Sequence, residues 1–358
     1  MSLSSLSFKS FFKKIASLPP EYENISVETA LNSRCSSDND GDPKNFHWGI
    51  FDNSKKLSYK HISIILKATN IPRFINKALK VHNKKNFLTF TIDRKAKGIE
   101  REWLMVESGM QQQAVFLTCA ALGIGVQIHN MGKDGSPINK EEYGTIQAEL
   151  KPMKPSFNGS YWSKLPPLGE RPWRTGNLPD PDRDSGKPLM SVISNLKTSN
   201  KGPKKVTRKI VGQLLWAARG RTPHYYMSKP WGLTIPTWAG EQGISSVYLL
   251  SKEGTFIYIN WEDDHPTHTF KKINNKSISI TDIHNILKIN PLPSYAIALG
   301  KNEKFARALW EIGYQLENLI LQASSLNISF KTILLDKKQK NAFLNLGIKE
   351  VIGLFCIF

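Results

Sequence analysis

Apolar residues recur at every third or fourth position in residues 206–218 and 305–326, which predicts two amphipathic helices. A breaker at 220–223 ends the first of them. Two short runs rich in β-branched and aromatic residues, 245–250 and 255–261, flank Lys252-Glu253-Gly254 and predict a hairpin. Residues 295–299 form a third apolar run of strand length. The second half of the chain therefore combines helices with strands.

The first half repeats part of this pattern. A Glu-x-Gly-x-Gln segment begins at residue 107 and again at residue 311, and this offset of 204 also superposes apolar residues up to 124 and 328. The helical pattern at 57–68 matches 206–217 at an offset of 149. The first copy therefore lacks a block of about 55 residues, which we assign to about 230–264, and it keeps a strand at 86–93. Two unequal copies can cover each other's apolar faces as a pseudo-dimer within one chain.

Eight of the 20 prolines lie between residues 152 and 188, where no helical or strand period is visible, so this stretch predicts an irregular connector. The expected division is a first half at 1–150, a connector at 151–204 and a second half at 205–358. Residues 1–20 place aromatic and aliphatic residues at helical spacing among lysines. They predict an N-terminal helix packed on its own fold, with a transit peptide or a surface-seeking helix as alternatives.

The composition shows a net positive charge, and the cysteine pattern indicates a reducing compartment. Lys and Arg number 49 against 30 Asp and Glu, a net of +19, which attracts phosphate on a nucleic acid, a membrane or a nucleotide, or simply reflects surface composition. The three cysteines form no CxxC pair, which argues against a disulfide scaffold or structural zinc and favours the cytoplasm. No apolar run approaches the ~20 residues that span a bilayer.

Several segments together resemble the FMN-dependent nitroreductase superfamily, most closely its SagB-type dehydrogenase or azoline oxidase branch. They are Gln213-Leu-Leu-Trp-Ala-Ala-Arg-Gly220, the loop Thr234-Ile-Pro-Thr-Trp-Ala-Gly240 with the hairpin after it, the helix at 311–323, and the turn at 121–125. The resemblance implies an α+β fold, a mostly antiparallel sheet flanked by helices in each half, with FMN in the interface. Glu317 and Trp238 depart from the family's Gln and Ala.

The resemblance also implies one asymmetric FMN site per chain. A glycine turn would lie against the flavin ring, the loop of the second half would close over it, two lysines would meet the phosphate, and Arg34 with Ser36 would replace the family's basic N-terminal motif. The mirror-image site lacks its loop, and Asn327-Ile328-Ser329 replaces its glycines. The implied cofactor-binding residues are Gly123, Ile124, Gly125, Lys151, Lys154, Pro236, Thr237, Trp238, Ala239, Gly240, Arg34 and Ser36.

The expected function is hydride transfer through flavin N5, with NAD(P)H or an organic or peptide substrate, in a pseudo-dimeric monomer or a higher homo-oligomer. No catalytic residue is assigned; His224, Tyr225 and Tyr226 are the nearest titratable candidates. The alternative is a non-catalytic pseudo-enzyme or a basic nucleic-acid-binding protein. The basic run at 201–209 is better interpreted as a solvated linker, which disfavours nucleic acid. Residues 38–42, 180–186 and 263–268 contain clustered metal-type ligands but are interpreted as turns, so no metal is expected.

Overall fold

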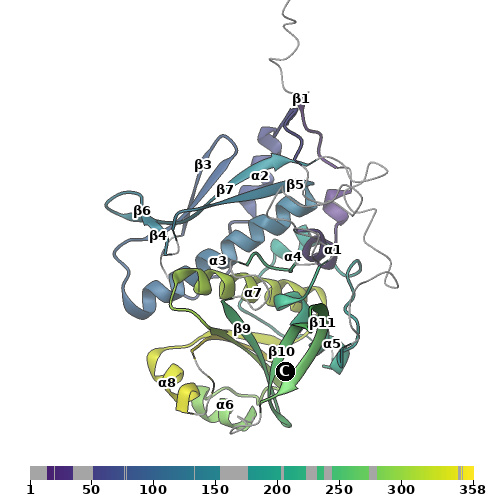
Figure 1. Cartoon of the computed structure of the whole chain (residues 1–358), viewed down its shortest axis with the longest axis vertical. Coiled ribbons are helices and arrows are strands. Elements are labelled where there is room, and N and C mark those ends of the chain that lie inside the picture. The colour runs from purple at the N-terminus through teal and green to yellow at the C-terminus, as the bar shows by residue number, and fades with distance from the viewer. Residues whose placement is uncertain are drawn as a thin grey trace, which may run out of the picture.

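The computed structural model describes residues 14–19, 21–34, 51–75, 77, 79–132, 134–153, 176–202, 205–222, 232–237, 244–273, 280–345, 348 and 350–358. Two long helices lie between two antiparallel sheets, the first sheet built from the first half of the chain and the second mainly from the second half (Figure 1). One apolar core runs through both halves and includes side chains from both helices. The expected α+β fold is confirmed.

The two central helices are α3 (Gly98–Ala121) and α7 (Ala306–Ser325), and they pack directly on each other. Gly109 and Gly313, the glycines of the repeated Glu-x-Gly-x-Gln segment, lie at the crossing. A Cβ on Gly109 would lie 2.3 Å from the carbonyl oxygen of Trp310, and one on Gly313 would lie 2.8 Å from the Cα of Gly109. The repeated glycines therefore allow the helix backbones to touch.

The first sheet has the strand order β3-β4-β7-β5, with every neighbouring pair antiparallel. Its strands are β3 (Lys80–Lys84), β4 (Phe87–Asp93), β7 (Glu142–Pro152) and β5 (Ile124–Asn130), and β6 (Ser136–Pro137) pairs with β7. The strand expected at 86–93 is thus present as β4. Helix α2 (Tyr59–Lys67), capped by Ser58, contacts α3.

The second sheet has the order β11-β10-β9-β12-β14-β13-β8 and is antiparallel throughout. Its strands are β8 (Ser199–Asn200), β9 (Ser245–Ser251), β10 (Gly254–Glu262), β11 (His265–Lys272), β12 (Tyr295–Lys301), β13 (Phe330–Leu334) and β14 (Val351–Ile357). The hairpin, third strand and long helix expected from the sequence are β9–β10, β12 and α7.

Strand β14 is buried along its whole length because both faces of the second sheet are covered. Phe355 and Ile357 join the main core, which also contains apolar side chains of α7. Leu354 and Cys356 join a second cluster that includes Ile283 from α6 (Ile280–Leu287) and Phe343 from α8 (Lys337–Asn345). A strand covered on both faces shows a continuous apolar run instead of alternation.

The two sheets share one strand order. β3-β4-β7-β5 of the first sheet corresponds to β9-β12-β14-β13 of the second, and in each half the long helix follows the second strand of this order. Gly123 (φ 64°) follows α3, and Asn327 (φ 54°), 204 residues later, takes the same left-handed conformation after α7. Because β3 has the place of β9 in this order, the elements of the second half without a counterpart before the long helix are β10, β11 and α6, and α8 is a further one after it. The sequence alignment had placed this extra block at about 230–264.

Three further segments differ from or extend the expectations. The described part of the connector contains α4 (Leu189–Ile193) and β8, so it is not irregular throughout. Near the N-terminus, β1 (Lys14–Ile15) pairs in parallel with β2 (Lys55–Lys56), so the described part of the expected helix at 1–20, residues 14–19, contains a two-residue strand and no helix. A 3₁₀ turn, η2 (Tyr22–Asn24), precedes α1 (Val27–Ser33), which is buried against α3 and α7. Among the described helices, none has the length and apolar character needed to cross a membrane.

Candidate functional site

The segment 232–237 of the second half is attached to the end of α5 (Arg208–Arg219), which begins at its N-cap Thr207, near the expected position. The amide of Thr234 donates to the carbonyl oxygen of Gly220 at 3.0 Å, and the amide of Thr222 donates to that of Gly232 at 3.0 Å. This segment forms the first part of the loop that resembles the family's cofactor loop. Its backbone is therefore fixed by hydrogen bonds to the residues that follow α5.

Side chains from both halves converge on the carbonyl oxygen of Thr234. It accepts hydrogen bonds from Arg34 Nε at 3.2 Å, Gln113 Nε2 at 3.0 Å and Asn318 Nδ2 at 3.2 Å. Gln113 also donates to Asn318 Oδ1 at 2.8 Å, and Arg34 Nη2 donates to the carbonyl of Leu233 at 2.7 Å. These donors come from the end of α1, from α3 and from α7. The loop therefore lies in the interface between the halves.

The last described residue of this loop carries a hydroxyl without a described partner. Thr237 Oγ1 is buried and has no hydrogen-bond partner among the described residues. The preceding residue, Pro236, is also buried. A buried hydroxyl without a partner is costly and often marks a place where a ligand or water binds. The rest of the expected loop, Trp238, Ala239 and Gly240, lies outside the described residues, as do the candidate bases His224, Tyr225 and Tyr226.

The glycine turn has local structural reasons for its two glycines. Gly123 adopts a positive φ at the end of α3, a conformation that glycine takes without steric cost. A Cβ on Gly125 would lie 2.2 Å from Cε1 of the Phe51 ring, so this ring fills the space in which a flavin was expected. Ile124 is buried in the core. The turn therefore packs against the first half's own chain.

Lys151 lies beside the same aromatic ring. Its Nζ donates to Gln127 Oε1 at 2.8 Å, lies 3.4 Å from the Glu149 carboxylate and sits 5.1 Å from the centre of the Phe51 ring. These contacts hold Lys151 within the first half. Lys154 and Ser36, the other residues proposed near a phosphate, lie outside the described residues.

The structure thus separates the expected site into two groups. Arg34 and Gln113 bind the loop at the carbonyls of Leu233 and Thr234, and Pro236 and Thr237 follow in the same loop. Gly123 follows ten residues after Gln113, about 15 Å along the helix direction, and belongs with Gly125 and Lys151. Gln113 and Asn318 had no assigned role in the sequence, although the motif at 311–323 contains Asn318.

A buried ion pair fixes the other end of the loop region. Arg219 Nη1 lies 2.9 Å from Glu311 Oε1 and also donates to the carbonyl of Ser245 at 3.2 Å. The other carboxylate oxygen of Glu311 accepts from the amide of Ile244 at 3.2 Å. The pair joins α5, α7 and β9. Arg219 lies within the resemblance motif at 213–220, but nothing in the sequence identifies Glu311 as its partner.

Glu317 is the second departure from the family pattern. It is fully buried on α7, and neither carboxylate oxygen has a hydrogen-bond partner among the described residues. Burial raises the pKa of Glu317 to about 8, so the side chain is mostly protonated at neutral pH. A protonated carboxyl has nearly the shape of a carboxamide and can also donate a hydrogen bond. At pH 7 the Glu317 side chain can therefore act much as a glutamine would at this position.

The two histidines considered as metal ligands lie in different surroundings, and the acids at 38–42 lie outside the described residues. His265 is exposed, whereas His268 is buried, with its Nδ1 2.8 Å from the Tyr258 hydroxyl. Asp182 accepts from the amides of Asp184 and Ser185, which is the hydrogen bonding of a turn, as expected. In the part of the chain that the structure describes, no group of three or more His, Cys, Asp or Glu is placed to hold a metal ion.

Comparison with known proteins places the fold. No protein-family model matches the chain, and no curated protein matches it. A crystal structure of a protein described as a nitroreductase from Anabaena variabilis superposes with a TM-score of 0.53 at 11% identity, covering 76% of this chain and 68% of that protein. The fold is nitroreductase-like. A protein of the same description from Ralstonia eutropha is 20% identical, covers 54% of this chain and 95% of its own length, and has a TM-score of 0.36.

The nitroreductase-like fold allows a test of whether the residues suit FMN. The loop meets the test in part, because Thr237 presents a buried hydroxyl without a described partner and Arg34 places a guanidinium at the same loop. The glycine turn does not, because Phe51 occupies the space at Gly125. Among the described residues, those at the loop would suit a flavin, whereas the space beside Gly125 is filled by Phe51.

Proposed function

We propose that this chain is an FMN-dependent oxidoreductase whose flavin binds at the 232–240 loop, between the two halves. The observation that carries the proposal is the convergence of Arg34, Gln113 and Asn318 on the carbonyl of Thr234. This arrangement fixes one loop with donors from both halves, as expected for an interfacial cofactor site. The bound flavin would supply hydride transfer, while the protein binds and orients it.

The chain's own residues would divide the work of holding the flavin. Arg34 contributes positive charge at a buried position, which favours an electron-rich or anionic group nearby. Thr237 offers a hydroxyl that can donate to a flavin oxygen or accept from a flavin nitrogen. Gln113 and Asn318 act as positioning residues, since both bind the loop backbone. Their hydrogen bonds keep the Thr237 end of the loop in place.

We further propose that the halves at 1–150 and 205–358, joined by the connector at 151–204, arose by internal duplication and form an intrachain pseudo-dimer. The shared strand order and the touching glycines Gly109 and Gly313 support this proposal. Only the second half carries the 232–240 loop, so we expect one flavin per chain. Titration with FMN followed by gel filtration measures the ratio; a value near two would refute the asymmetric site.

Flavin binding itself is the first test. Purified protein, or protein incubated with FMN, should show flavin absorption and release FMN on denaturation. Thr237→Val removes the hydroxyl with little change of shape and should weaken FMN binding about fivefold, the effect of one hydrogen bond. Thr89→Val on β4 of the first sheet is the matched control and should leave binding unchanged. Colourless protein that fails to bind added FMN would overturn the proposal.

The substrate class also remains a proposal. NAD(P)H is the expected reductant, and an organic molecule or a peptide azoline, as in the SagB-type branch, is the expected partner. Anaerobic mixing of the flavin-loaded protein with NADH or NADPH should bleach the flavin absorption. Reoxidation by candidate acceptors then separates nitro compounds from azoline peptides.

A non-catalytic pseudo-enzyme is the second candidate, and the Phe51 ring at Gly125 favours it. Gly125→Ala should destabilise the protein, and adding Phe51→Leu should restore part of the lost stability because the clash is with the ring. If Gly125 instead serves flavin binding, Gly125→Ala will lose FMN affinity, and adding Phe51→Leu will not restore that affinity. A flavin that binds but is not reduced by either nicotinamide would favour the non-catalytic protein.

A further inference from the structure

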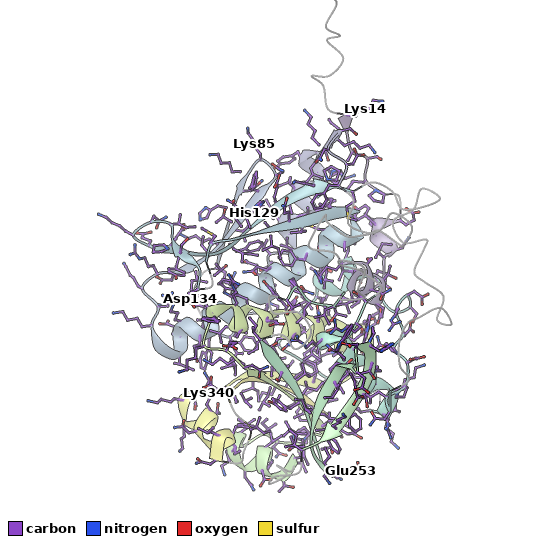
Figure 2. All side chains as sticks on the ribbon, in the orientation of Figure 1. Lys14, Lys85, His129, Asp134, Glu253 and Lys340 are labelled. Atoms are coloured by element: carbon purple, nitrogen blue, oxygen red, sulfur yellow. The ribbon has the colours of Figure 1, made fainter. Side chains whose placement is uncertain are left out.

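The positive charge of the chain is concentrated in one segment. Residues 51–100 contain twelve Lys and Arg against three Asp and Glu, a net of +9 out of +19 for the whole chain. This segment forms β2, α2, β3 and β4. Lys14 and Lys85 project at the same end of the molecule, away from Lys340 and Glu253 (Figure 2). The excess positive charge is therefore localised in this segment, which does not include the 232–237 loop.

A pocket of about 530 Å³ lies within this basic region. It is bounded by the β2–α2 segment, the β3–β4 turn and the end of β7, and its volume is in the range of small-ligand sites. No residue of the 232–237 loop lines it. Its lining includes four lysines, three asparagines, two acids and an aromatic residue: Lys55, Lys56, Lys85, Lys151, Asn53, Asn83, Asn86, Asp52, Glu149 and Tyr59.

The charges of the pocket do not balance. Lys55 lies 3.2 Å from the Asp52 carboxylate, and Lys151 lies 3.4 Å from that of Glu149, so both acids are matched. Lys56 and Lys85 remain as excess positive charge at the rim. In the β1–β2 ladder, Lys14 is moreover the direct partner of Lys55, and like charges so placed repel each other. An anionic ligand would relieve this repulsion.

The remaining lining indicates what kind of anion fits. Asparagine amides both donate and accept hydrogen bonds, as the edge of a nucleobase requires. Tyr59 is 88% exposed at the start of α2, so its ring is free to stack on a base. The Asn86 amide already donates to the Leu150 carbonyl at 3.2 Å, which leaves the amides of Asn53 and Asn83 for a ligand, and a flat membrane surface has no use for a concave site with such amides. We propose that this pocket binds a nucleoside phosphate, either a free nucleotide or one unit of a single-stranded nucleic acid.

The experiment uses the full chain loaded with one equivalent of FMN and freed of unbound FMN by gel filtration, so that neither the flavin loop nor free FMN competes. Calorimetric titrations with AMP, ADP, pyrophosphate and a short oligouridylate measure affinity. Lys56→Ala/Lys85→Ala should weaken nucleotide binding roughly tenfold, since two exposed charge contacts are lost. Lys337→Ala/Lys338→Ala on α8 removes the same charge from the opposite end and should change nothing. Flavin absorption should be unaffected in both variants, which separates this site from the proposed function.

Tyr59 separates base recognition from simple attraction of anions. Tyr59→Ala should weaken AMP and oligouridylate binding but not pyrophosphate binding, whereas Tyr59→Phe should retain all three. Oligouridylate binding tighter than AMP binding, and falling steeply with salt, identifies the strand as the source; equal or tighter AMP or ADP binding identifies a free nucleotide.

Three results would overturn the proposal. The first is the absence of any nucleotide binding, including the case in which phosphatidylglycerol vesicles bind instead. The second is nucleotide binding that Tyr59→Ala leaves unchanged. The third is an equal loss of affinity in the α8 control, because the effect would then reflect net charge alone.

Discussion

The contact between Gly109 and Gly313 allows a sharp test of how the two halves are joined. Gly109→Ala places a Cβ 2.3 Å from the Trp310 carbonyl oxygen, and Gly313→Ala places one 2.1 Å from that of Val106. Both obstacles are backbone atoms of a facing helix, which cannot rotate away as a side chain can. An ordinary van der Waals separation requires the helices to move apart by roughly 1 Å.

The magnitude follows from two opposing effects. Overpacking of this kind costs about 3 kcal/mol, at the upper end of the usual range because backbone is involved. Alanine favours a helix over glycine by about 1 kcal/mol. The expected net loss is therefore about 2 kcal/mol in the free energy of unfolding for either substitution.

Gly212 of α5 supplies the matched control. A Cβ there would lie 3.4 Å from His268 Nε2 and 3.6 Å from the Pro179 carbonyl oxygen, which are tolerable contacts. Gly212→Ala should be neutral or stabilise by up to about 1 kcal/mol through helix propensity. Urea denaturation followed by circular dichroism measures all three variants. If Gly109→Ala and Gly313→Ala are as stable as Gly212→Ala, the helices do not meet as described.

Two further predictions concern buried charges. Burial raises the pKa of Glu317 to about 8 from its ordinary 4.5, so between these pH values the folded state holds a proton that the unfolded state has lost. The free energy of unfolding should therefore fall from pH 5 to 8, by up to about 1.4 kcal/mol per pH unit, and level off above pH 8. Glu317→Gln should flatten this decline in urea titrations, and an unchanged slope would contradict it. Arg219→Met should cost about 3 kcal/mol or more by stranding Glu311, whereas Lys271→Met, in an exposed pair, should cost under about 1 kcal/mol in the same assay; similar losses would show that burial is not decisive.

The agreement between sequence and structure is best where local pattern decides the outcome. Helices α5 and α7 and strands β4, β9 and β12 follow directly from apolar periodicity, because an element with one buried face repeats its apolar residues at its own period. Strand β14 carries no such alternation, since helices cover one face and the core covers the other. Its six apolar residues and Gly353 specify burial but not partner or direction.

The candidate site likewise combines features that the sequence shows with contacts that only the structure shows. The residues 232–237 attracted attention as a motif, yet their anchoring by Arg34 and Gln113 joins positions 200 and 121 residues away in sequence. The reason for Gly125 is likewise Phe51, a side chain that no spacing rule connects with it. Hydrogen bonds and steric contacts of this kind depend on which elements the fold brings together, so they appear only in three dimensions.

The sequence by itself determined the repeated helix, because the Glu-x-Gly-x-Gln segment occurs twice together with the same apolar spacing. It did not determine what the repeat is for. Tertiary structure decided that the two glycines face each other, since only a packed helix pair makes a missing Cβ matter. It also decided where the excess positive charge lies. The composition gives a net charge of +19, and folding places lysines of β2, the β3–β4 turn and β7 around one pocket. The residue types alone set the net charge, whereas a binding site requires that the fold bring these residues close together.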